Sequence, residues 1–254
     1  MAPRWAAFLG LTGLVVTLLL ALARLSQDVL RGRRAPAPEV DPAPDGDSAG
    51  TATPDLSTGA LLANVALTQG LFAVVLLAGA WYFRIPARAF GVTAAGGSTG
   101  PPAIAAGVAL GVGLWVANEA SAGLLEAAGW GYDEGLRELL APDSAGGWVV
   151  LLVVVLPMVA GAEELVFRGA VVGVPAAGFG TSPWALAVVS ALAFALGHGA
   201  QGRAGVVVTG LLGLGLAAGF VLTGSLLAVV LAHYLVNALE FVVHEGLAPD
   251  HCVG

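Results

Sequence analysis

The chain has 254 residues, of which 57% are hydrophobic and only 11% charged, and its mean hydropathy is +0.88. Soluble domains carry about 25% charged residues, so this composition excludes an ordinary soluble protein and predicts a multi-pass integral protein of the cell membrane. The net charge of −7 argues against nucleic-acid binding, and the single cysteine, Cys252, excludes an internal disulfide and a cysteine-based zinc finger.

Residues 5–23 form the first apolar run, which is long enough to span a bilayer as a helix. Ala21-Leu22-Ala23 at its end is similar to a signal-peptidase site, but a cluster of arginines follows, and such a cluster normally keeps its flank in the cytoplasm. We therefore expect an uncleaved first span. Residues 36–55 contain five prolines and five acidic residues without a basic residue, which predicts a disordered linker.

The remaining apolar runs predict six further spans. Asn118 and Glu119, near the end of the third span, and Glu240 and His244, near the end of the last, are interpreted as polar helix ends at the membrane interface. Residues 126–147 form a polar connection that could contain a short interfacial helix. The six runs lie at about 59–83, 102–125, 148–172, 184–198, 204–222 and 226–243.

These runs predict an all-α fold, a polytopic transmembrane helical bundle of about seven spans, or eight if the count is one short. The chain divides into four parts. They are the first span with the acidic, proline-rich linker (1–58), accessory spans (59–147), a catalytic transmembrane core (148–247) and a tail (248–254).

Three polar fragments lie in or beside apolar runs of the catalytic core. They read EELVFR at 163–168, FALGH at 194–198 and HYLVN at 233–237. A charged side chain at the centre of a bilayer costs about 3 kcal/mol on insertion scales, so these polar groups are hard to explain unless they meet one another. We therefore predict that the three fragments converge on one site.

The first fragment contains two adjacent carboxylates that must point in different directions. Neighbours on a helix differ by about 100°, so Glu163 and Glu164 cannot point the same way, whereas Glu164 and Arg168 share a face at four-residue spacing. A desolvated Glu163 is suited to take a proton from water. A structural Glu–Arg pair that locks two helices is the alternative, and it explains Glu164 and Arg168 but leaves Glu163 without a partner.

The other two fragments supply histidines. A lone histidine such as His198 is more often a satisfied core residue than a catalyst. His233 and Asn237 share one helix face at four-residue spacing, where two donors can hold a developing oxyanion. His233 could equally bind a metal, and a structural interhelical hydrogen bond is the third alternative. The sequence contains no HExxH zinc motif, no GxSxG motif and no Walker loop.

Taken together, the three fragments resemble the pattern of the CPBP intramembrane proteases, which include the type II CAAX prenyl endopeptidases and bacteriocin-processing or self-immunity (Abi) proteins. The family pattern is EExxxR, then FxxxH, then HxxxN or HxxxD, on successive membrane helices. The resemblance covers residues 148–247. Its seven positions are matched in order by Glu163, Glu164, Arg168, Phe194, His198, His233 and Asn237.

The resemblance implies an intramembrane endopeptidase that hydrolyses a peptide bond near the membrane surface, in CAAX-type or related processing. It implies that Glu163 activates the water with assistance from His198, that His233 and Asn237 stabilise the oxyanion, and that Glu164, Arg168 and Phe194 support the site. The cofactor stays open, because the same residues can work without a metal. The alternative is a zinc ion held by Glu163, His198 and His233.

The expected partners are the lipid bilayer and a protein or peptide substrate, with or without a prenyl group. The alternative function is a non-catalytic membrane protein of the same fold that serves in immunity or partner binding. A small transporter with a buried proton relay is a third class that would explain intramembrane glutamate and histidine.

Overall fold

The computed structural model describes residues 2–34, 57–94, 96–130 and 135–247. Over these ranges the chain is helical, with turns and short loops between the helices, and the predicted all-α bundle is confirmed. The predicted disordered linker at 36–55 and the tail at 248–254 lie outside the described residues.

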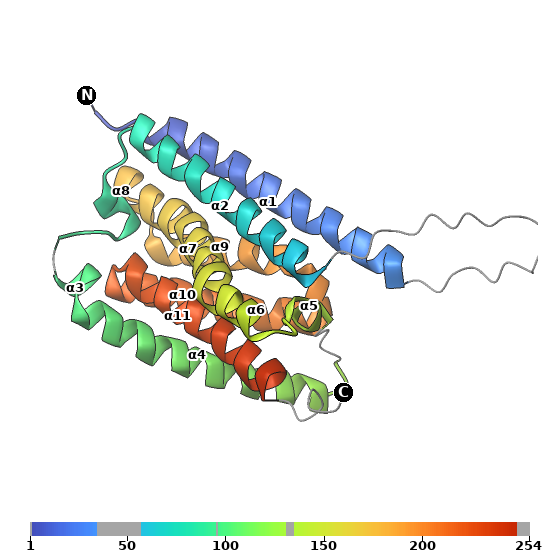
Figure 1. The fold of residues 1–254 in the computed structure, drawn as a ribbon. Coiled ribbons are helices and arrows are strands. Elements are labelled where there is room, and N and C mark those ends of the chain that lie inside the picture. The colour runs from blue at the N-terminus through green and yellow to red at the C-terminus, as the bar shows by residue number, and fades with distance from the viewer. Residues whose placement is uncertain (1, 35–56, 95, 131–134, 248–254) are drawn as a thin grey trace, which may run out of the picture.

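Four helices precede the catalytic core, and a short helix follows them in the polar connection. Their bounds are α1 (Trp5–Arg34), α2 (Thr58–Tyr82), the 3₁₀ turn η1 (Ala87–Phe90), α3 (Gly96–Thr99), α4 (Pro101–Ala127) and α5 (Gly135–Leu140). In Figure 1, α1 and α2 lie side by side along one side of the bundle and α4 lies on the opposite side.

The core that the sequence predicts to be catalytic begins with one long helix of 35 residues, Ala145–Phe179, which changes winding along its length. Two stretches are π-helical, and prolines stand just after the first and second of them, at Pro157 and Pro175. Wide π turns are frequent at functional sites. The segments are α6 (Ala145–Val150), η2 (Leu151–Val155), α7 (Leu156–Glu164), η3 (Leu165–Gly173) and α8 (Val174–Phe179).

Three further helices, which follow the long helix in sequence, complete the core. Helix α11 packs against α4 and α7, and α10 packs against α9. In Figure 1, α7, α9 and α10 lie between the α1–α2 pair and α4. The elements are α9 (Pro183–Gly197), the 3₁₀ turn η4 (Gly199–Gln201), α10 (Gly202–Thr223), α11 (Leu226–Phe241) and the π turn η5 (Val242–Gly246).

Six of the described helices are long and apolar enough to cross a membrane, and the fifth expected span is a shorter apolar helix of 15 residues. Helix α9 starts at the Ser182 cap with Pro183 in its first turn and stops at Gly197. At 1.5 Å per residue it is about 22 Å long, less than the roughly 30 Å of a bilayer core. Its last residue is followed by His198, which is half-buried.

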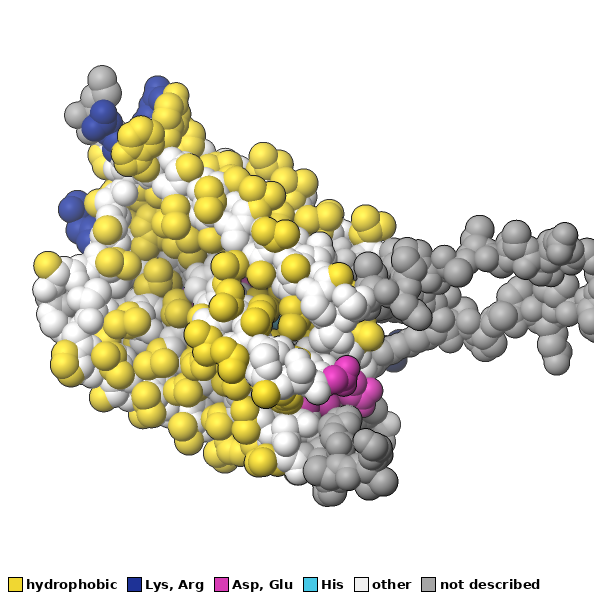
Figure 2. Space-filling view, viewed as in Figure 1, with side chains coloured by type: hydrophobic (Ala, Val, Ile, Leu, Met, Phe, Trp, Pro, Cys, Tyr) yellow, Lys and Arg dark blue, Asp and Glu magenta, His cyan; other side chains and the backbone are white. Residues whose placement is uncertain are grey.

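The surface of the molecule matches a membrane setting. Large apolar side chains are exposed along the long helices, such as Leu67 on α2 and Leu124 on α4. Figure 2 shows this apolar surface across the middle of the molecule, with basic side chains near the N-terminal end and acidic side chains near the opposite end. Such an apolar band between polar ends is typical of a protein that crosses a bilayer.

Glycines bring α4 and α11 into close contact. A Cβ on Gly107 would lie 2.7 Å from the carbonyl oxygen of Ala228, and one on Gly111 would lie 3.0 Å from Cα of Ala232. Small residues four apart allow the backbones of membrane helices to approach closely. This contact fixes the position of α11 immediately before His233.

Candidate active site

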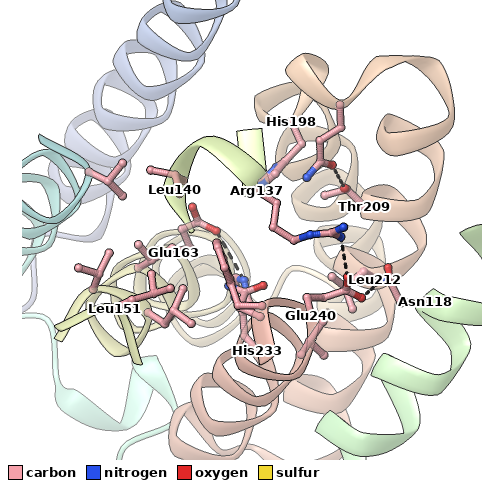
Figure 3. A pocket seen from close by; sticks show the side chains of 18 of the residues that line it. Asn118, Arg137, Leu140, Leu151, Glu163, His198, Thr209, Leu212, His233 and Glu240 are labelled. Atoms are coloured by element: carbon pink, nitrogen blue, oxygen red, sulfur yellow. Dashed lines mark hydrogen bonds and ion pairs between the residues drawn. The ribbon is translucent and has the colours of Figure 1, made fainter. Parts of the chain in front are cut away.

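The three polar fragments line one cavity inside the bundle. This cavity has a volume of about 230 Å³, and Glu163, His198, His233 and Asn237 all contribute to its wall (Figure 3). A second cavity, of about 330 Å³, lies against α1 and α2 and is also lined by Glu163 and His198. These two side chains therefore stand between two hollows, where a chain bound across both would pass them.

Glu163 lies in the last turn of α7, and only 9% of it is exposed. Its Oε1 atom accepts a hydrogen bond of 3.0 Å from Nε2 of Gln69 on α2. Its Oε2 atom lies 3.8 Å from Nε2 of His233, too far for a direct hydrogen bond. One carboxylate oxygen is therefore held by α2, while the other remains beside the cavity.

Glu164 points from a different face of the helix and is fully buried. Its Oε1 atom accepts hydrogen bonds of 2.8 Å from Nη1 of Arg168 and from Nδ1 of His233. Arg168, also fully buried, donates from Nη2 to the carbonyl oxygen of Gly213 at 2.8 Å. The Glu164–Arg168 pair thus joins η3 to α10 and α11, and it orients the His233 ring.

His198 stands at the end of α9, where the short 3₁₀ turn begins. Its Nδ1 atom donates to the main-chain carbonyl of Phe194 at 2.8 Å, since a carbonyl oxygen can only accept. A neutral ring in this tautomer leaves Nε2 as an acceptor. Gly202, with a φ of 75°, then turns the chain into α10.

Phe194 separates and packs the polar groups. Its ring centroid lies 4.5 Å from that of His198 and 5.8 Å from that of His233, and the Arg168 guanidinium carbon lies 4.8 Å above the ring. The Phe194 side chain is 1% exposed. A rigid aromatic ring in contact with three site residues limits the rotamers that they can adopt.

Asn237 is half-buried and lies one helical turn after His233 on α11, where it lines the first cavity. No described residue makes a hydrogen bond with its side chain. Its amide therefore remains available to a bound molecule, on the same helix face as His233.

The alternative zinc ligands are Glu163, His198 and His233. Both histidines have their Nδ1 atoms on oxygen acceptors, as zinc-binding histidines usually do. Among the described residues, however, the one group of three such side chains whose ligand atoms lie within 4.8 Å of one another is Glu119, Glu240 and His244. Glu163, His198 and His233 are not such a group among the described residues, and zinc at these three side chains stays a prediction of the resemblance.

A polar network closes one end of the first cavity. Arg137 on α5 contacts Glu240 at 3.3 Å, and Glu240 accepts a 2.6 Å hydrogen bond from Asn118 (Figure 3). Arg137 also contacts Glu245 at 2.7 Å. His244 lies 3.0 Å from Glu119. The sequence predicted two separate polar helix ends at the interface. In the structure their side chains form one connected group, because α4 and α11 lie side by side.

Residues 145–239 match the family model described as type II CAAX prenyl endopeptidase Rce1-like. The chain contains an Rce1-like domain. This segment holds all seven motif residues, and over it the resemblance to the CPBP intramembrane proteases is confirmed. The Rce1-like family consists of CAAX proteases of the membrane, which are hydrolases, and the six long apolar helices make this chain an integral membrane protein. No curated protein and no solved structure shows significant similarity to the chain.

Several residues that reach the site lie outside the Rce1-like domain. Gln69 and Arg137 come from the part of the chain before it, and neither was singled out from the sequence as a site residue. Gln69 is an isolated amide in the apolar 59–83 run, a weak signal that would have suggested an inward-facing position. Arg137 gave no signal, because a charged residue in a polar connection is ordinary.

Proposed function

We propose that this chain is an intramembrane endopeptidase that hydrolyses a peptide bond near the membrane surface, in CAAX-type or related processing of proteins or peptides. The observation that carries this proposal is that Glu163, His198, His233 and Asn237, from three helices, line the same cavity within a lipid-bounded bundle. A carboxylate, two imidazoles and an amide are the groups that acid–base hydrolysis of an amide requires.

Glu163 is proposed to act as the general base. A water molecule between Glu163 and His198 gives a proton to Oε2 of Glu163 while its oxygen bonds to the carbonyl carbon of the substrate. The carbonyl electron pair moves to oxygen and forms a tetrahedral oxyanion. When the C–N bond breaks, Glu163 returns the proton to the leaving nitrogen, so that atoms and charge balance. Nε2 of His198, which has no hydrogen-bond partner among the described residues, accepts a hydrogen bond from the water.

His233 and Asn237 are proposed to hold the oxyanion. Asn237 donates from its amide. Because His233 already donates from Nδ1 to Glu164, it is proposed to donate from Nε2 to the oxyanion in its doubly protonated form. Removing one donor of an oxyanion site costs about 10²–10³-fold in kcat. Glu164, Arg168 and Phe194 keep the His233 ring in place.

The substrate is proposed to be a peptide segment that enters from the bilayer side. The second cavity is lined by Leu19, Leu20 and Leu22 of α1 as well as by Glu163. An apolar wall next to the proposed base suits a substrate that carries a lipid near its scissile bond, and a prenyl group belongs to this chemical class.

Cleavage of a prenylated C-terminal peptide by the purified protein in lipid vesicles tests the proposal. Glu163→Gln keeps the shape of the side chain but removes the base, and it is expected to lower kcat by about 10²–10⁴-fold. Glu119→Gln, which changes a carboxylate outside the proposed machinery, serves as the matched control and should stay within a few-fold of the parent. Cleavage by Glu163→Gln at the parent rate would overturn the role of Glu163 as the base, whereas no cleavage by the folded parent would favour the alternative, a non-catalytic partner-binding protein.

A further inference from the structure

The Glu163 carboxylate is tied to a helix that lies outside the Rce1-like domain. Nε2 of Gln69, on α2, donates to Oε1 of Glu163 at 3.0 Å across 94 positions of sequence. Both side chains also line the second cavity. Among the described residues, Gln69 is the one that hydrogen-bonds to this carboxylate.

The orientation of the Gln69 amide follows from its partner. A carboxylate accepts hydrogen bonds and repels a carbonyl oxygen, so the NH₂ group must face Glu163. The Oε1 atom of Gln69 then points away, and it is buried without a hydrogen-bond partner among the described residues. An unsatisfied buried acceptor lowers stability, so packing alone does not explain a glutamine at this position.

The contact between α2 and α7 does not depend on this hydrogen bond. Helix α2 is anchored by apolar side chains that are buried in two core clusters, such as Leu62, Phe72 and Leu76. Glycine at position 70 also lets α2 approach α7, because a Cβ there would lie 3.2 Å from Sδ of Met158. The Gln69–Glu163 bond is therefore an addition to a packed interface, and it acts on one carboxylate oxygen only.

We propose that Gln69 is a positioning residue for the Glu163 base, an inference that rests on the proposed function. By occupying Oε1, the Gln69 amide fixes the rotation of the carboxylate and leaves Oε2, 3.8 Å from His233, as the oxygen that faces the reacting water. The part of the chain before the Rce1-like domain thus supplies a component of the reaction centre. A carboxylate that is free to rotate would present the correct oxygen for only part of the time.

Steady-state cleavage in vesicles tests this role through the separation of kcat from KM. Gln69→Met, similar in size but without the N–H donor, is expected to lower kcat by roughly 10- to 100-fold while KM stays within about twofold. Its thermal midpoint should stay close to that of the parent, since the substitution removes the unsatisfied Gln69 acceptor together with the donor, and the Glu163 carboxylate lines both cavities, where water can replace that donor. Leu71→Met, on the lipid-exposed side of α2, introduces the same residue and should change neither constant.

Gln69→Asn provides a second variant should the methionine protein fold poorly. It keeps an amide but withdraws the N–H by one methylene group, and the same loss of kcat is expected. A kcat equal to that of the parent in a folded Gln69 variant would overturn the inference. It would also be overturned if, in both variants, activity falls only in proportion to the amount of folded protein. If these variants behave like the parent while Glu163→Gln is inactive, the proposed function stands and only the role of Gln69 fails. A parent protein that cleaves nothing would overturn both.

Discussion

At the scale of single residues, the site depends on how two adjacent carboxylates are divided. The spacing of Glu164 and Arg168 predicts a shared helix face, and the structure places them 2.8 Å apart in full burial, while Glu163 faces the cavity. The link from Glu164 to His233 and that from Gln69 to Glu163 could not be predicted, because each joins residues far apart in sequence whose contact depends on helix packing.

The buried ion pair gives a prediction for stability. Arg168→Leu leaves the Glu164 carboxylate in the core without its cation, which should lower the free energy of unfolding by about 3–5 kcal/mol. Arg203→Leu, the same change at an exposed arginine, should stay within about 0.5 kcal/mol of the parent. Denaturant unfolding of the two proteins in the same micelles measures the difference. Equal stabilities would show that the pair contributes nothing to the fold.

At the scale of the elements, the lengths of the apolar runs predicted where the helices lie but not which stretches are π-helical. All seven expected runs are helices, but the 184–198 run gives a helix too short to cross a bilayer core, because Pro183 and Gly197 limit it. The π-helical stretches, including η3 with Arg168, left no signal in the apolar pattern. Within η3, Ser190 of α9 donates at 2.8 Å to the carbonyl oxygen of Phe167, a contact between helices that the apolar pattern does not contain.

The α4–α11 contact predicts a difference between two identical substitutions on one helix. Gly107→Ala places a methyl group 2.7 Å from the Ala228 carbonyl oxygen, so the helices must separate, at a cost of about 1–3 kcal/mol. Gly113→Ala meets no atom within 4 Å and should keep or slightly raise stability. Thermal unfolding of both variants measures this contrast. The packing account is wrong if Gly107→Ala is as stable as Gly113→Ala.

At the scale of the whole molecule, the bundle places a polar site among long apolar helices. The motifs predicted that three fragments would meet, and the family model supports the protease assignment for residues 145–239. The contribution of α1 and α2 to the second cavity could not be predicted from the sequence, because the motifs do not extend to these helices. The short α9 and the glycine-mediated α4–α11 contact then place His198 and His233 at the depth of Glu163.

The central claim is that water activated at Glu163 cleaves a peptide bond in this cavity. Its most direct test is mass spectrometry of the products formed in ¹⁸O-labelled water by the parent protein and by Glu163→Gln, in vesicles that contain a lipid-modified peptide. The account predicts that the parent places one ¹⁸O atom in the new carboxyl group and that Glu163→Gln forms almost no product. Labelled product from Glu163→Gln at the parent rate, or parent product without the label, would contradict it.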